Sequence, residues 1–182
     1  GAGAYAEAVS VYLAFAVDKV TDYWTNLATW RARGTVHHLF ARQAIPMVWD
    51  FAEANPFADF HASWIELLNW VAMSVGALKP AARGTASQED AATVGHPTAI
   101  PISTDPPYYD NVGYADLSDY FYVWLRNSVR DIYPELFSTL LVPKAPEMIA
   151  SPYRFGGDSA AATEHFESGL IRAFARMREI IP

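Results

Sequence analysis

Four consecutive residues, Asp105-Pro106-Pro107-Tyr108, combine groups that could hold a planar ligand. The aspartate carboxylate and the proline carbonyl both accept hydrogen bonds, and two adjacent prolines fix the backbone that presents them. The tyrosine ring adds a flat face for stacking. Two converging acceptors beside an aromatic face suit a planar substrate with an exocyclic amino group, and adenine is such a substrate.

Such a site could also activate the amine that it binds. The amino lone pair of adenine is delocalised into the ring, so the amine is a poor nucleophile. Two acceptors on its N–H groups favour a more pyramidal nitrogen, which can attack a positioned methyl sulfonium in line. Positioning and electrostatics would supply most of the catalysis. A base in a duplex must first be flipped out, and Tyr108 could then stack on it.

Helical segments surround this motif, and we expect short strands next to it. Apolar residues recur at helical spacing, and they predict the following helices: residues 4–29, 62–78, 114–130 and 159–180, a short helix at 46–54 and a helical turn at 135–140. Two short strands are predicted at residues 85–90 and 98–104, and Pro101 demotes the second to an edge or irregular strand. Asp105 would then follow the carboxyl end of a strand, where open α/β sheets place their ligands.

Composition restricts the class of protein. The chain has 182 residues, of which 52% are hydrophobic, so we expect a globular domain with a core. There is no cysteine, which excludes disulfides and thiolate metal sites and fits a cytoplasmic protein. The sequence shows no signal peptide and no apolar run long enough for a membrane span.

The net charge of −7 makes the chain no obvious nucleic-acid binder, because phosphate contacts need lysine and arginine. Any basic surface for DNA must therefore be local. The best candidates are Arg172, Arg176 and Arg178, for which a solvated helix face is the favoured interpretation. The histidine pair His37-His38 has no carboxylate or histidine partner at ligand spacing. The remaining histidines are isolated, so no metal site is predicted: His61, His96 and His165.

The stretch "STDPPYYD" resembles motif IV of amino-group methyltransferases that use S-adenosylmethionine. Aspartate in the first place is similar to the adenine-N6 enzymes, whereas serine is more typical of the cytosine-N4 enzymes. The longer run "TDPPYYDNVGYADLSDYFYVWLR" and the stretch "ARQAIPMVWDFAEANPF" resemble the large adenine-specific DNA methylases of bacteria and archaea, which often carry a zinc ribbon. The resemblance covers most of residues 36–180.

The resemblance implies a role for each motif residue. Asp105 would hold the target amine, the Pro106 carbonyl would be the second acceptor, Pro107 would keep the turn rigid, and Tyr108 would stack on the base. The run "QEDAATV" resembles motif III, so Asp90, fifteen residues before Asp105, would contact the adenine of S-adenosylmethionine, although an ordinary loop acid is equally compatible.

Three residues after the motif follow it closely enough to line a base pocket: Tyr109, Asn111 and Tyr114. Packing or capping of the next helix is an equal alternative for them. DNA is the partner that the resemblance implies.

The chain also departs from the pattern of these enzymes, because it lacks a Phe-x-Gly-x-Gly turn for the methionine part of the cofactor. The opening "GAGAY" has glycines but no preceding strand. We therefore expect a fragment with an α/β, mostly helical fold: a helical subdomain at residues 1–80 and an incomplete Rossmann-like catalytic portion at residues 83–182. Such a fragment would be inactive alone, and it would pair with the missing parts of its parent or, through unpaired strand edges, with a second copy.

Two other functions are compatible with the same residues. The chain could be a non-catalytic helical interaction or DNA-binding module that retains the motif as architecture. It could also belong to a methyltransferase for another amine: cytosine N4, RNA or a protein side-chain amide.

Overall fold

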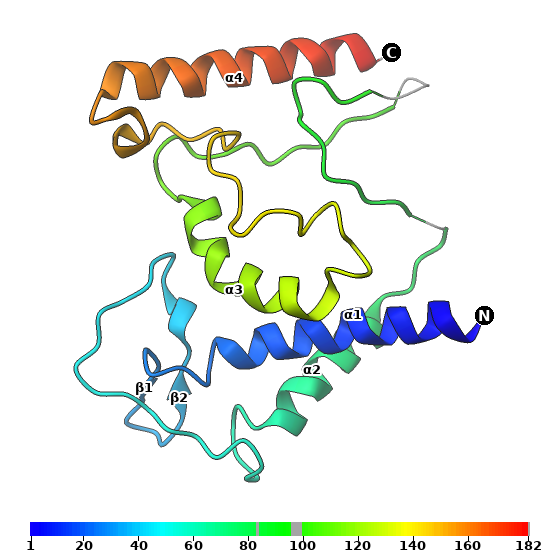
Figure 1. Cartoon of the computed structure of the whole chain (residues 1–182), viewed down its shortest axis with the longest axis vertical. Coiled ribbons are helices and arrows are strands. Elements are labelled where there is room, and N and C mark those ends of the chain that lie inside the picture. The colour runs from blue at the N-terminus through cyan, green and yellow to red at the C-terminus, as the bar shows by residue number, and fades with distance from the viewer. Residues whose placement is uncertain (83, 96–99, 182) are drawn as a thin grey trace. The chain divides into compact units, whose positions relative to one another are not determined.

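The computed structural model describes residues 1–82, 84–95 and 100–181. The elements are, in order, α1 (Ala2–Thr21), β1 (Thr29–Trp30), β2 (Val36–His37), the 3-10 helix η1 (Leu39–Ala41), α2 (Trp64–Ala77), α3 (Tyr114–Val129), the 3-10 helix η2 (Pro152–Phe155) and α4 (Ser159–Ile180) (Figure 1). Helices therefore dominate, which confirms the expectation of a mostly helical chain. The sheet of the described residues is the antiparallel pair β1–β2. No helix in the described part of the chain is long and apolar enough to cross a bilayer.

The chain separates into two compact units. The first unit consists of residues 1–84 and 116–142, and the second unit of residues 85–115 and 143–182. The division passes through the first turn of α3. The sequence placed a boundary near residues 80–83, and it did not associate residues 116–142 with the N-terminal helices.

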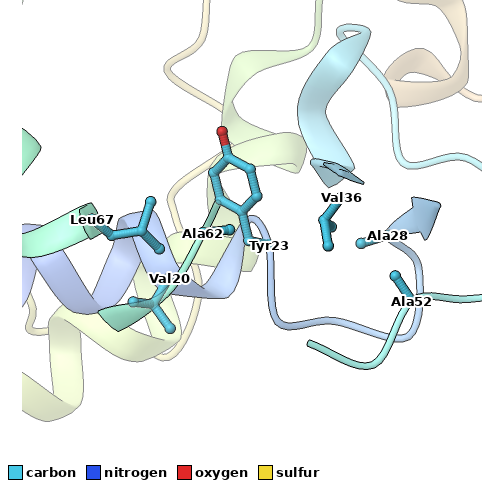
Figure 2. Packing of buried hydrophobic residues seen from close by; sticks show 7 residues of the cluster. All are labelled: Val20, Tyr23, Ala28, Val36, Ala52, Ala62 and Leu67. Carbon is cyan, nitrogen blue, oxygen red and sulfur yellow. The ribbon is translucent and has the colours of Figure 1, made fainter. Parts of the chain in front are cut away.

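The core of the first unit forms where the end of α1, the β1–β2 pair and the start of α2 meet (Figure 2). Its buried members are Val20, Tyr23, Ala28, Val36, Ala52, Ala62 and Leu67. The indole N–H of Trp24 donates to the Ala62 carbonyl at 2.9 Å, which ties the chain after α1 to the segment before α2. The N-terminal part of α1 is largely exposed, although its apolar periodicity predicted a buried stripe.

Capping interactions define the start of α2 and α4. Ser63 accepts a hydrogen bond from the Glu66 N–H, and the Glu66 carboxylate accepts one from the Ala62 N–H at 2.8 Å. This reciprocal arrangement satisfies two donors that the first turn leaves without helical partners. The Asp158 side chain accepts hydrogen bonds from two N–H groups at the start of α4. The predicted helices 62–78, 114–130 and 159–180 are confirmed.

The prediction that the first helix continues to residue 29 is wrong, because α1 ends at Thr21. The next residue, Asp22, is buried, and its carboxylate accepts a hydrogen bond from the Phe40 N–H at 2.9 Å. Its carbonyl accepts another from the Leu39 N–H at 2.8 Å. These long-range partners stop the helix and turn the chain toward β1.

Three further local predictions are wrong for the described residues. Residues 46–54 form no helix, and the Ala52 N–H instead donates to the Ala28 carbonyl at 2.9 Å. Residues 85–90 and 100–104 form no strand, because no neighbouring strand supplies ladder partners and Pro101 removes a donor. Residues 98 and 99 of the second predicted strand lie outside the described residues. The predicted helical turn at 135–140 corresponds to a single turn that begins slightly earlier, in which the Phe137 N–H donates to the Tyr133 carbonyl at 3.3 Å.

Candidate functional site

The Asp105–Tyr108 motif lies in the second unit, on a segment without regular secondary structure, and all four residues are exposed. The Tyr108 hydroxyl donates a hydrogen bond to Asp105 Oδ1 at 3.0 Å. The structure thus brings the predicted amine acceptor and the predicted stacking ring into direct contact. The two prolines between them restrict the backbone that allows this contact.

The Asp105 carboxylate changes the acidity of the tyrosine. The hydrogen bond to Asp105, and then the negative charge of Asp105, raise the pKa of Tyr108 above its ordinary value. The hydroxyl therefore stays protonated at neutral pH and acts as a donor. In this arrangement Asp105 accepts a hydrogen bond from a neighbouring side chain of the same segment.

Tyr109 fixes the downstream end of the motif. Its backbone has a φ of 55°, in the left-handed region that non-glycine residues rarely adopt. Its carbonyl accepts a hydrogen bond from the Ala150 N–H at 3.1 Å, and its hydroxyl lies 2.7 Å from Thr163 Oγ1 on α4. Its ring packs edge-to-face on Phe166, with the ring centroids 5.2 Å apart. Tyr109 is therefore an anchor on α4, which corresponds to the packing alternative for this residue.

Asn111 and Tyr114 lead from the motif into α3. The Asn111 N–H donates to the Tyr108 carbonyl at 3.1 Å and closes the turn after the motif. The Tyr114 N–H donates to the Val112 carbonyl at 3.1 Å, and its side chain is mostly exposed. Asn111 and Tyr114 are both exposed and belong to the same unit as the motif.

A groove of about 520 Å³ lies upstream of the motif, between the chain just before Asp105 and the C-terminal half of α4. Its lining consists of Ile102, Thr104, Phe174, Met177, Arg178 and Ile181. Downstream of the motif, Tyr109 attaches the chain to α4, whereas upstream the groove separates the chain from α4.

Asp90 makes local contacts that define a turn. Its Oδ1 accepts a hydrogen bond from the Ala92 N–H at 2.8 Å, and its carbonyl accepts one from the Val94 N–H at 2.8 Å. The Val94 carbonyl in turn accepts a hydrogen bond from Arg176 Nε at 2.7 Å. The structure thus places Asp90 in a turn attached to α4, and Arg176 of the C-terminal cluster serves this attachment rather than projecting into solvent.

Glu147 positions the start of α3, a role that no sequence pattern indicated. Its Oε1 accepts a hydrogen bond from the Ala115 N–H at 3.0 Å, and its Oε2 pairs with Arg154 at 2.6 Å. Both carboxylate oxygens are thereby used in holding the chain that follows the motif. Glu147 and Ala115 are 32 residues apart, so a local pattern could not reveal the contact.

The described residues contain no group of three or more histidine, aspartate or glutamate side chains that could hold a metal ion. His38 lies 3.1 Å from the Asp22 carboxylate, and His61 lies 3.7 Å from Glu66. His165 Nε2 lies 3.1 Å from the Glu147 carbonyl. These histidines have structural partners, and His96 lies outside the described residues.

In comparisons with known proteins, no family model, no curated protein and no solved structure matches this chain. The chemistry of the described residues themselves therefore has to indicate the function. The hydrogen bond from Tyr108 to Asp105 places a carboxylate acceptor next to an aromatic ring.

Proposed function

We propose that this chain carries the amine-binding part of an S-adenosylmethionine-dependent DNA methyltransferase that acts on the N6 amine of adenine. Asp105 and the Pro106 carbonyl accept hydrogen bonds from the amine, and Tyr108 stacks on the flipped base. The observation that carries this proposal is the exposed, tethered pair of Asp105 and Tyr108 on the Asp-Pro-Pro-Tyr segment.

Substrate binding requires the Tyr108 hydroxyl to leave the Asp105 carboxylate. In the structure this hydroxyl occupies Asp105 Oδ1, so an incoming amine replaces one donor by another. The free-energy cost of this exchange is small, because both side chains are exposed and water can solvate the released hydroxyl. Stacking of the base on the Tyr108 ring, which is 66% exposed, then favours the bound arrangement.

The described residues do not by themselves fit S-adenosylmethionine. The printed sequence contains no Phe-x-Gly-x-Gly turn, and the Asp90 carboxylate, which would contact the cofactor's adenine, caps its own turn through the Ala92 N–H. The proposal therefore assigns amine binding to this chain and cofactor binding to other segments.

Methyl transfer measured with the longest polypeptide that contains these 182 residues tests the proposal. Methyl-labelled S-adenosylmethionine and mixed-sequence DNA are incubated with the protein, and the nucleosides are analysed by mass spectrometry. We expect N6-methyladenine from the unmodified protein and none from Asp105→Ala. Asp110→Ala removes an exposed acid from the same segment and serves as the matched control, which should retain activity.

The outcomes separate the proposal from its alternatives. Equal N6-methyladenine from the unmodified protein and Asp105→Ala would show that Asp105 does not hold the amine. Label in N4-methylcytosine, RNA or a protein amide would assign the site to another amine. Absence of transfer to all of these substrates would favour the non-catalytic module. The printed chain alone should produce no methylated base.

A further inference from the structure

A basic stretch in the first unit contrasts with the acidic character of the whole chain. Between Asp22 and Asp50 the sequence contains three arginines and two histidines but no acidic residue, whereas the chain has a net charge of −7. The three arginines, Arg31, Arg33 and Arg42, are all exposed. The acidic groups of the chain are thus concentrated elsewhere, and this stretch is locally cationic.

The β1–β2 hairpin gives this stretch a defined shape. Thr29 pairs with His37 and Trp30 with Val36, and a turn that contains Gly34 at a φ of 75° connects the strands. Alternate residues of a strand point to opposite faces. Val36 is buried in the core, and the half-exposed Trp30 lies on the same face of the hairpin at the edge of the core, with its ring centroid 5.8 Å from that of Phe60. Thr29 and His37 face the other side.

A groove of about 290 Å³ lies on that other side of the hairpin. Its lining consists of Leu27, Thr29, His37, His38, Leu39, Ala41, Arg42, Ala44, Pro46 and Val48. Most of these side chains are apolar, and the basic ones are His37, His38 and Arg42. An apolar floor with cationic groups beside it suits a ligand that has both a flat apolar part and a negative charge.

The charges near the groove determine the protonation state of His37. Burial lowers the pKa of His37, and the charges of Arg31, His38 and Arg42 lower it further. Arg42 lines the groove together with His37 and His38, and Arg31 directly follows β1 of the hairpin. His37 is neutral at neutral pH and serves as a hydrogen-bonding group, while the arginines supply the positive charge. The nearest acid on these elements, Asp22, is buried and engaged by the Phe40 N–H and by His38.

Exposed apolar side chains continue the groove along the chain. Trp49 is 93% exposed and directly follows Val48 of the lining, and Met47 between Pro46 and Val48 is 79% exposed. An indole that is so exposed gains little from the core, but it offers a stacking face. Basic groups along a groove together with exposed aromatic rings are the combination that binds single-stranded nucleic acids.

We propose that the groove beside the β1–β2 hairpin binds a single strand of nucleic acid, with phosphates on Arg31 and Arg42 and an unpaired base stacked on Trp49. The assignment of the strand as DNA rests on the proposed function. The binding itself rests on the charge and shape of the groove. The groove lies entirely within the first unit, whereas the Asp105 motif belongs to the second unit.

Fluorescence anisotropy of a labelled oligothymidine of about 20 nucleotides, titrated with the full 182-residue chain at several salt concentrations, tests the proposal. The double variant Arg31→Gln/Arg42→Gln should bind at least about 10-fold more weakly. Its slope of log K against log salt should be smaller by about 1.4, because two phosphate contacts on a single strand are lost. Trp49→Ala should bind the oligothymidine about 10-fold more weakly, as expected for the loss of one stacked base. Its slope of log K against log salt should be unchanged.

The control variant removes the same number of positive charges as the groove variant, but at positions outside the groove. Arg130→Gln/Arg172→Gln removes two exposed arginines outside the groove and should bind like the unmodified chain. Circular dichroism checks that each variant retains its helices. Oligothymidine binding by the unmodified chain, together with no methyl transfer by the longer polypeptide that contains it, would contradict the proposed function alone and leave strand binding supported.

Three results would overturn the proposal. The first is no oligothymidine binding by the unmodified chain. The second is an equal loss in the groove variant and in the control variant. The third is equal or tighter binding of a hairpin duplex or of polyglutamate, because a duplex hides its bases and polyglutamate has no phosphate.

Discussion

Asp18 of α1 is a carboxylate whose burial opposes folding at neutral pH. Its Oδ1 is buried and has no hydrogen-bond partner among the described residues. Desolvation raises the pKa of Asp18 from 3.8 to about 7. Its neighbour Lys19 lies 3.8 Å from Asp22, so that lysine is placed toward a different carboxylate. The ionised form of Asp18 is therefore poorly compensated in the folded chain.

The sign of the pH effect follows from the raised pKa. The folded state binds a proton that the unfolded state has released between pH 3.8 and about 7, so the free energy of unfolding falls as the pH rises through this window. A shift of about three pKa units corresponds to at most about 4 kcal/mol. Because the side chain is partly exposed, solvent screening reduces this to about 1–2 kcal/mol.

The substitution Asp18→Asn removes this charge and keeps the shape of the side chain. We expect it to stabilise the first unit by about 1–2 kcal/mol at pH 8, and by about 1 kcal/mol less at pH 5. All six tryptophans belong to the first unit, so their fluorescence reports its unfolding in urea without interference from the second unit.

Glu7→Gln provides the control, since Glu7 is an exposed acid on the same helix. Its effect on the urea midpoint should be small and nearly equal at both pH values. A stability change of Asp18→Asn that is equal at pH 5 and pH 8 would refute the reasoning. So would a destabilisation that is confined to pH 8.

Three further predictions concern the second unit, and each is measured by thermal unfolding followed by helical circular dichroism. Asp158→Ala removes the N-cap of α4 and should cost about 1 kcal/mol, whereas Asp158→Asn should cost little. Gly169→Leu should cost about 1–3 kcal/mol, because a Cβ at this position would lie 2.9 Å from Met148 Cγ. The double variant Gly169→Leu/Met148→Ala should recover part of that stability loss. Strictly additive effects of the two substitutions would contradict a steric contact between residues 169 and 148. Tyr109→Phe should cost about 0.5–1 kcal/mol, and Thr163→Val should cost more because it also removes the bond from Thr163 Oγ1 to the Ser159 carbonyl at 2.9 Å. The two costs should not be additive, since both substitutions remove the bond between Tyr109 and Thr163.

Helices with local start signals were predictable from the sequence. The start of α4 follows Asp158, and the start of α2 has Ser63 with Glu66 three residues later. In both cases the capping groups and the first turn are adjacent in the chain, so the relevant physics is local. The predicted limits of α4 agree with the structure at both ends, and those of α2 differ by one or two residues.

The end of α1 was not predictable in this way. The apolar periodicity continues through Tyr23, Trp24 and Leu27, and nothing in that stretch breaks a helix. The chain nevertheless leaves the helix after Thr21, because Asp22 bonds to backbone groups of Leu39 and Phe40. A partner 18 residues away decides the boundary, and helix propensity is too weak to oppose it.

The candidate site also combines a local contact with long-range contacts that the sequence could not predict. The sequence predicted that Asp105 and Tyr108 act together, and their side chains, three residues apart, meet in the structure. The anchoring of Tyr109 could not be predicted, because Thr163 and Phe166 are more than fifty residues away. Periodicity also gave no sign of the groove beside β1–β2, since its strands have only two residues each.

The contact between Asp105 and Tyr108 has a consequence for any amine that binds there. In the structure the protonated Tyr108 hydroxyl occupies the position on Asp105 Oδ1 that an N–H donor of a substrate would take. It therefore restrains the Asp105 side chain before a substrate binds. Removing the hydroxyl while keeping the ring separates this positioning from stacking. If the hydroxyl only competes with the amine, Tyr108→Phe should bind adenine more tightly. If it preorients Asp105, the same substitution should weaken binding, because the carboxylate then loses its local partner and samples other rotamers.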